Sequence, residues 1–181
     1  MKRAWWLIPL VALALVIACG RIGTTRGMLV DSENATANDI QAWAATSWVQ
    51  TSQAEFESGV PVQVDTASYP GSVVLQDTGG FYPATGSLAS QVLDTGMAGE
   101  VWNTLAWDES LETGTDITFE IRASDTSFSV GDGTPGWSSV GSTSPVMSGL
   151  PGGRYMQWRA ILATSDNTVT PSLHEVRVFH Y

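Results

Sequence analysis

The sequence predicts an all-β fold, and three observations carry that prediction. Apolar and polar residues alternate between Val101 and Trp107, and they alternate again between Ile117 and Arg122. Clusters of Gly, Pro, Asp and Ser separate such runs at short intervals, as turns between strands require. No stretch with the periodicity of an ordinary helix interrupts the runs. The pattern is typical of antiparallel strands with one face on a core and the other in water.

Apolar runs of strand length follow one another from residue 60 onwards. They are Val60–Val64, Ser72–Leu75, Ser87–Leu93, Val101–Trp107, Asp116–Ala123, Tyr155–Thr164 and His174–Tyr181, with weaker runs near Trp48 and at Pro145–Met147. Such a series without crossover helices predicts an antiparallel two-sheet β-sandwich, jelly-roll-like, over residues 55–181. In that sandwich Ile117, Phe119 and Ile121 should point into the core.

Residues 1–27 have the features of a signal peptide or a membrane-anchoring leader. Lys2 and Arg3 precede an apolar run from Ala4 to Ala18, as the charged and hydrophobic parts of an export signal do. The run is shorter than the roughly 20 apolar residues that a membrane-spanning helix needs. We therefore expect a protein that is extracellular or at the cell surface.

Residues 28–54, between the leader and the sandwich, are expected to form an extended acidic arm. Apolar residues such as Ile40, Trp43 and Phe56 are loosely spaced there, so the spacing leaves both a short helix and an extended conformation open. We favour an extended arm that enters the domain near Trp48.

The charge distribution argues against nucleic acid as a partner. Four of the eight basic residues precede Gly27 and all 18 acidic residues follow it, so the rest of the chain carries 4 − 18 = −14. Such a surface repels phosphate backbones and anionic headgroups, which leaves the leader or a lipid anchor as the expected membrane contact. Cys19 is the single cysteine, so no intramolecular disulfide can form.

No catalytic motif is recognisable, and we expect a protein without enzymatic activity. The sequence contains no GxSxG, HExxH, P-loop or dinucleotide-binding fingerprint. His174 and His180 lie six residues apart in an expected strand, which places them on one face but roughly 20 Å from each other. That separation is too wide for one metal ion or one catalytic triad, so no catalytic residue is assigned.

Loop carboxylates are the candidate metal ligands. Calcium prefers carboxylate and carbonyl oxygens, which makes Asp77, Asp125 and Asp132 candidates for a structural calcium site. Their spacing matches no known calcium loop, so ordinary solvated side chains are the alternative. No other cofactor is expected.

Tryptophan residues are the candidate sugar-binding residues, because pyranose rings stack on exposed aromatic faces. Trp107 shares a face with Leu105 and is expected in the core. Trp102 and Trp137 are the better exposed candidates, and Asp132 lies in the same long connection as Trp137. Long loops at the edge of a sandwich are a usual place for binding sites, although a plain surface loop pinned by one tryptophan is the simpler interpretation.

The segment from Gly23 to Trp43 has the pattern of a particular leader junction. The pattern begins with a small residue, an apolar pair and Asp, for which the sequence has Gly27, Met28, Leu29 and Asp31. It continues with a polar run, then Asn, an apolar residue and Ala, for which the sequence has Glu33, Asn38, Ile40 and Ala42. With these residues the segment resembles the junction of the TasA and camelysin group of matrix proteins. The resemblance implies export through a dedicated signal peptidase and cleavage near Gly27. Arg26 and Leu29 depart from the pattern.

Two alternatives for the leader stay open. Val16 to Cys19 resembles a bacterial lipobox, which implies a surface lipoprotein lipidated at Cys19. The other alternative is that the leader is retained as an anchor.

The strand runs carry a second resemblance. Five stretches together resemble a secreted β-sandwich module of bacterial and archaeal surface proteins. They are Ser90–Gly96, Trp102–Trp107, Ile117–Arg122, Gly153–Leu162 and Thr170–Val178. The resemblance implies a fold loosely like carbohydrate-binding jelly rolls and a place beside sugar-binding or adhesive domains.

Together these features predict a non-catalytic surface or extracellular-matrix protein that acts through assembly or adhesion. The expected mode is a fibre subunit, in which the extended segment from Met28 to Trp48 adds to a neighbour's sheet edge. The alternative is a carbohydrate-binding module. The expected partners are accordingly further copies of the chain, other surface proteins or a polysaccharide.

Overall fold

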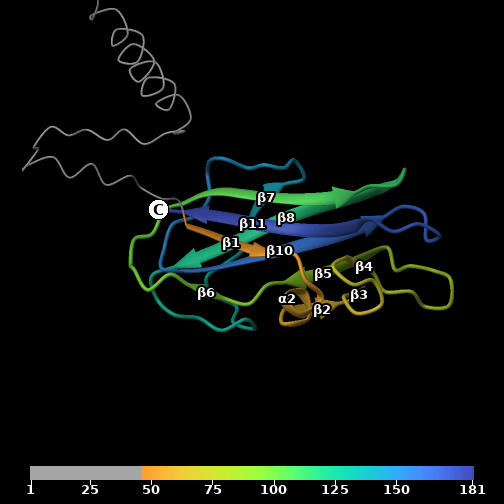
Figure 1. Ribbon diagram of the computed structural model, residues 1–181, viewed down its shortest axis with the longest axis horizontal. Helices are drawn as coiled ribbons and strands as arrows, with labels where there is room; N and C mark the ends of the chain where they lie inside the picture. The colour runs from red at the N-terminus through yellow and green to blue at the C-terminus, as the bar shows by residue number, and fades with distance from the viewer. Residues whose placement is uncertain (1–45) are drawn as a thin grey trace, which may run out of the picture. The chain divides into compact units, whose positions relative to one another are not determined.

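The computed structural model describes residues 46–181 (Figure 1). The expected signal peptide, the lipidation of Cys19, the leader junction from Gly23 to Trp43 and the arm up to residue 45 lie outside the described residues. Within them, two antiparallel β-sheets pack face to face, so the predicted all-β sandwich is confirmed.

The first sheet is built around the C-terminal strand. Its strands are β1 (Thr46–Gln50), β3 (Val64–Asp65), β4 (Val73–Leu75), β7 (Trp102–Ser110) and β11 (Ser172–His180). Strand β11 pairs with β7 on one side and with β1 and β4 on the other, and β3 pairs with β4. The strand that comes last in the sequence therefore holds this sheet together.

The second sheet is built around the strand before it. Its strands are β2 (Val60–Val62), β5 (Thr85–Ala89), β6 (Leu93–Asp94), β8 (Thr115–Ser124), β9 (Ser138–Gly141) and β10 (Tyr155–Thr164). Strand β10 pairs with β8 along its whole length, from Tyr155 opposite Ser124 to Thr164 opposite Thr115. On its other side β10 pairs with β5 and β6, while β2 and β9 lie outermost.

The core lies between the two sheets and contains the residues that the alternation predicts. Ile117, Phe119 and Ile121 are fully buried. The rings of Trp107 and Phe119 stack with their centroids 4.3 Å apart, so the core position expected for Trp107 is also confirmed. Full burial of side chains of this size contributes about 1.5–3 kcal/mol each.

The sandwich begins earlier than residue 55. Strand β1 pairs with β11 from Thr46 opposite His180 to Gln50 opposite Val176, which gives the extended entry near Trp48 that the sequence predicts. A single turn of helix, α2 (Gln53–Glu57), then crosses to the second sheet. The side chain of Ser52 accepts a hydrogen bond from the backbone N–H of Glu55, and the carboxylate of Glu55 accepts the N–H of Ser52, forming a capping box.

A β-bulge in β7 reverses the expected orientation of Trp102. Phe179 pairs with Thr104 and His180 pairs with Trp102, so Asn103 is an extra residue without a partner in β11. Beyond the bulge the alternation shifts by one residue, and the indole of Trp102 turns towards the core. Trp102 is 2% exposed, and its Nε1–H donates to the carbonyl oxygen of Gly153 at 2.8 Å. The expectation of an exposed Trp102 was therefore wrong.

Candidate functional site

The connection between β8 and β9 is organised by one buried arginine, Arg122, at the end of β8. The guanidinium group donates to the carbonyl oxygens of Ser129 and Val130 through Nη2, and to those of Asp132 and Pro135 through Nη1. Its Nε–H donates to Oε1 of Gln157 at 2.8 Å. All five N–H donors of the side chain are thereby used, and Arg122 is 1% exposed. We call residues 125–137, which close over this group, the Arg122 loop.

Burial and the surrounding charges determine the electrostatics of Arg122. Burial lowers the pKa of the guanidinium from its ordinary value, the charge of Asp132 acts in the opposite direction, and Arg159 lowers it further. Carbonyl oxygens supply the compensating negative charge at hydrogen-bond distance, in place of a carboxylate ion pair. Gln157, which is fully buried, in turn donates through Nε2 to the carbonyl oxygen of Ser90, the residue after β5, and this bond fixes the side chain that Arg122 contacts.

Two aromatic side chains of the loop flank the same guanidinium. The Cζ atom of Arg122 lies 4.7 Å from the ring centroid of Phe128 and 4.6 Å from that of Trp137. Trp137 also contacts Arg159 of β10, whose Cζ atom lies 4.5 Å from the ring centroid. Arg159 forms an ion pair with Glu120, with Nε 2.8 Å from Oε2. Trp137 is half-buried and is held by two arginines from neighbouring strands.

A shallow hollow of about 220 Å³ lies on the Arg122 loop. It is lined by the hydroxyl side chains of Ser124, Thr126, Ser127 and Thr134, together with Phe128, Asp132 and Pro135. Oδ2 of Asp132 accepts the backbone N–H of Ser129 at 2.7 Å, which leaves Oδ1 without a partner among residues 46–181. The fold thus brings two of the sequence-predicted residues, Asp132 and Trp137, onto one loop around Arg122.

The sequence interpretation missed Arg122, Phe128 and Arg159. One signal was present, because Arg122 is one of only four arginines and lysines after Gly27 and lies three residues before the long connection that starts at Asp125. Alternation placed Arg122 on the solvent face of the sheet, and nothing in the sequence showed that the loop would fold back and cover it.

The three candidate calcium ligands are not brought together. Asp77 follows β4, where its Oδ1 accepts the N–H of Gly80 at 2.6 Å. Asp125 follows β8, where its Oδ1 accepts the N–H groups of Gly99 and Arg154 at 2.7 and 3.0 Å, and these bonds lower the pKa of its carboxyl. Among residues 46–181 no three His, Cys, Asp or Glu side chains lie close enough to hold a metal ion. Asp77 and Asp132 each accept from a backbone N–H three residues away, within a turn, whereas Asp125 links two segments that are distant in sequence.

The two histidines occupy different environments, contrary to the expectation that they share a face. Nδ1 and Nε2 of His174, each 2.9 Å from a hydroxyl oxygen, contact Ser72 and Ser110. His180 lies against Trp102, with ring centroids 4.8 Å apart, and its Nδ1 is 2.7 Å from Oε1 of Glu100. A bulge between Leu173 and Glu175 shifts the alternation of β11 between the two histidines.

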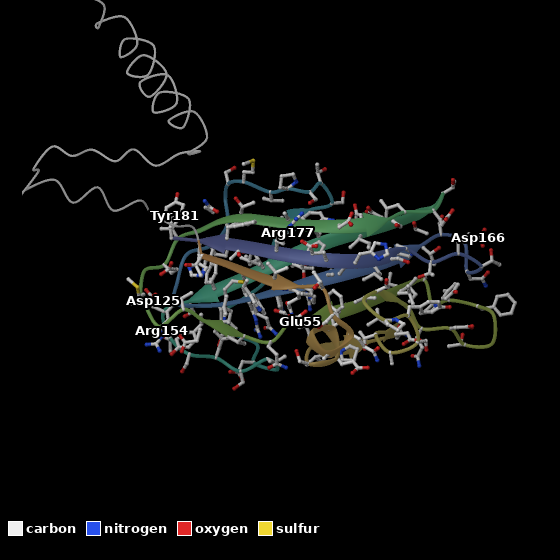
Figure 2. All side chains as sticks on the ribbon, in the orientation of Figure 1. Glu55, Asp125, Arg154, Asp166, Arg177 and Tyr181 are labelled. Carbon is white, nitrogen blue, oxygen red and sulfur yellow. The ribbon has the colours of Figure 1, made fainter. Side chains whose placement is uncertain are left out.

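A second hollow, larger and more open, lies at the other end of the sandwich. It measures about 470 Å³ and is lined by Ala84 and residues 164–167. Asp166 lies at this end, whereas Asp125 and Arg154 lie together at the opposite end (Figure 2). The lining of this hollow has neither an aromatic side chain nor a basic one, so it offers less for a ligand than the Arg122 loop.

The edges of the two sheets differ in how they are protected against pairing with another chain. Proline interrupts β2 at Pro61, and β3 and β6 have only two residues each. Strand β7 is covered where Leu105 exchanges two backbone hydrogen bonds with Val146, at 3.0 and 2.8 Å. Strand β9 carries a bulge at Val140. Proline, shortness, cover and bulges are the usual devices that block an edge.

Strand β1 has none of these devices. Its five residues, Thr46–Gln50, contain no proline and no charge, and they pair without a bulge. Tyr181 and Val101 exchange two backbone hydrogen bonds on the β7 side of β11. Because backbone groups alternate sides along a strand, the residues of β1 that bond to β11 are Thr46, Trp48 and Gln50. Ser47 and Val49 therefore direct their N–H and C=O groups to the outer edge.

Comparisons with known proteins do not assign the chain to a family. No protein-family model matches the chain, and no curated protein matches it significantly. In the part of the chain from residue 46 onwards, no helix is long and apolar enough to cross a membrane.

Proposed function

We propose that the chain is an exported surface or extracellular-matrix subunit that assembles by strand addition at the outer edge of β1. The observation that supports this most directly is the difference between the edges. Each other edge strand of the described residues is short, interrupted, bulged or covered, whereas β1 has five uncharged residues with outward backbone groups. The proposed role is binding rather than catalysis.

The occupant of this edge is the N-terminal arm of a neighbouring copy, residues 28–45. These 18 residues can span at most about 60 Å when extended, which is enough to reach an adjacent molecule. The arm and the β1 edge are different surfaces, so each copy donates to one neighbour and accepts from another. Contacts of this head-to-tail kind propagate into open fibres instead of closing into a dimer.

Substitution of Val49 by proline tests the proposal. The N–H of Val49 points away from β11, so Val49→Pro removes one donor from the outer edge and keeps the pairing of Trp48 and Gln50. Val49→Thr is the matched control, since it keeps the N–H group and a β-branched side chain. The full chain, expressed with its leader, is recovered from the cell surface and the medium and is analysed by size-exclusion chromatography and electron microscopy.

We expect arm-dependent oligomers or fibres from the wild type and from Val49→Thr, and monomers from Val49→Pro. Deletion of residues 28–45 should have the same effect as the proline. A monomeric wild type, or fibres that persist in Val49→Pro, would show that β1 is not the assembly edge. Far-ultraviolet circular dichroism of each variant checks that the sandwich is intact.

A further inference from the structure

We propose that the Arg122 loop binds a neutral carbohydrate, with the hollow beside Phe128 holding one sugar ring and Trp137 providing a stacking face beside it. This inference does not depend on strand addition, because it uses the outward face of the second sheet and not the edge of β1. It rests on three features of the loop, which are the lining of the hollow, the fixation of the aromatic rings and the pairing of both neighbouring cations, Arg122 and Arg159.

The lining of the hollow suits sugar hydroxyl groups. The side chains of Ser124, Thr126, Ser127 and Thr134 can each donate and accept a hydrogen bond, and Oδ1 of Asp132 is an acceptor without a partner among the described residues. The volume of 220 Å³ equals about seven water molecules and lies below the range of pockets for drug-sized ligands. A single ring with several hydroxyl groups matches both the size and the chemistry.

The aromatic rings are fixed before any ligand arrives. Arg122 contacts both Phe128 and Trp137, and its five hydrogen bonds hold it in place. Arg122 and Arg159 rise from the same outward face of the second sheet, so they contact Trp137 from the side of the sheet. Trp137 is half-buried, and the proposal assigns its remaining exposed surface to the face of a pyranose ring. Little side-chain entropy is lost when such a pre-ordered surface binds.

The charges of the site favour a neutral ligand over an anionic one. Arg122 is buried with all its donors used, and Arg159 is paired with Glu120. The one charged side chain that lines the hollow is the carboxylate of Asp132. An acidic polysaccharide or a phosphate group would therefore meet a like charge and find no unpaired cation.

Native affinity electrophoresis of the full chain tests the inference. The probes are two neutral polysaccharides, a soluble β-glucan and a galactomannan, and the anionic polygalacturonate. We expect at least one neutral probe to slow the wild type and polygalacturonate to leave its mobility unchanged. Trp137→Ala should weaken the retardation by roughly tenfold or more, as truncation of a central aromatic contact does. Tyr69→Ala is the matched control, because Tyr69 is a 51% exposed aromatic residue in a different turn.

Asp132→Asn provides a second variant in case Trp137→Ala disturbs the loop. Asparagine keeps an acceptor for the N–H of Ser129 but removes the charge, so the loop should persist while binding to the neutral probe weakens. Thermal unfolding of each variant reports whether it is folded. The inference is overturned if neither neutral probe slows the wild type, if polygalacturonate alone slows it, or if Trp137→Ala and Asp132→Asn both bind like the wild type.

Discussion

At the scale of single residues, Arg122 has the most demanding environment in the described chain. A buried guanidinium must find a partner for each of its five N–H groups, because an unpaired buried donor costs about 1–3 kcal/mol. Here the partners are backbone carbonyls of the residues that follow, together with Gln157. The side chain therefore dictates the path of the loop, and the loop in turn shields the charge.

Replacement of Arg122 by lysine should destabilise the protein strongly. An ammonium group makes at most three hydrogen bonds and lacks the planar geometry of guanidinium, so several of these carbonyl oxygens would lose their donor. We expect Arg122→Lys to lower the free energy of unfolding by about 3 kcal/mol, measured by urea denaturation. Arg177→Lys is the control, since Arg177 forms an exposed ion pair with Glu175, and it should change the value by less than about 0.5 kcal/mol. Equal effects of the two substitutions would contradict this account.

Asp125 should contribute to acid sensitivity. Two backbone N–H groups favour its ionised form and lower the pKa of its carboxyl in the folded protein. The stabilisation is therefore complete above the unfolded-state pKa of about 3.9 and is lost as the pH falls through the lower folded-state value. Asparagine at this position accepts the same bonds but does not titrate. We expect Asp125→Asn to flatten the decline of unfolding free energy between about pH 4 and pH 2, and an unchanged slope would refute the assignment.

At the scale of elements, the alternating pattern predicts strands well but does not predict bulges. Ile117, Phe119 and Ile121 lie where alternation places them, because β8 pairs with β10 without a register shift. Trp102 does not, because one extra residue in β7 reverses the face of everything before it. A bulge depends on the register in which two strands pair. This register is a property of both strands together and cannot be predicted from the sequence of one of them.

For the candidate site too, the sequence predicts residue types and loop positions but not how the Arg122 loop brings those residues together. Asp132 and Trp137 were identifiable from residue type and loop position. Their assembly around Arg122 depends on a backbone path that returns over the sheet, and this path is fixed by tertiary hydrogen bonds that local sequence does not reveal.

Gly86 in β5 marks a place where the two sheets approach closely. A Cβ atom there would lie 2.5 Å from the carbonyl oxygen of Gln63 and 2.8 Å from Cγ1 of Val64. We expect Gly86→Ala to destabilise the sandwich by about 2 kcal/mol or more, measured by chemical denaturation, because backbone must move to make room. Gly133→Ala is the control, since nothing lies within 4 Å of its Cβ position. If both substitutions were neutral, the close approach at β5 would be disproved.

At the scale of the whole molecule, acidic residues outnumber basic ones by 18 to 8. Arg154 pairs with Asp94, Arg159 with Glu120 and Arg177 with Glu175, while Arg122 is buried against carbonyl groups. Every basic side chain of the described residues is thus engaged, and the remaining carboxylates repel one another across the surface.

Salt should therefore stabilise the folded protein. Raising the ionic strength from about 0.01 M to about 1 M shortens the Debye length from about 30 Å to about 3 Å, which screens the repulsion between distant carboxylates. We expect the unfolding free energy at neutral pH to rise over this range, with sodium chloride as the salt and urea denaturation as the measurement. A decrease would mean that the ion pairs of the arginines outweigh the repulsion among the acidic groups.

The position of the last two strands has a consequence for the order in which the chain can fold. Strands β10 and β11 are the centres of the two sheets, and the C-terminus lies beside the start of β1 (Figure 1). A polypeptide delivered from its N-terminus, by a ribosome or through a pore, releases the outer strands first, and before β10 and β11 emerge only the pairs β2–β5, β3–β4 and β8–β9 can form. Neither sheet can close until residues beyond Tyr155 emerge, so β7 and β8 wait without their central partners, and β1 waits through the delivery of more than a hundred residues.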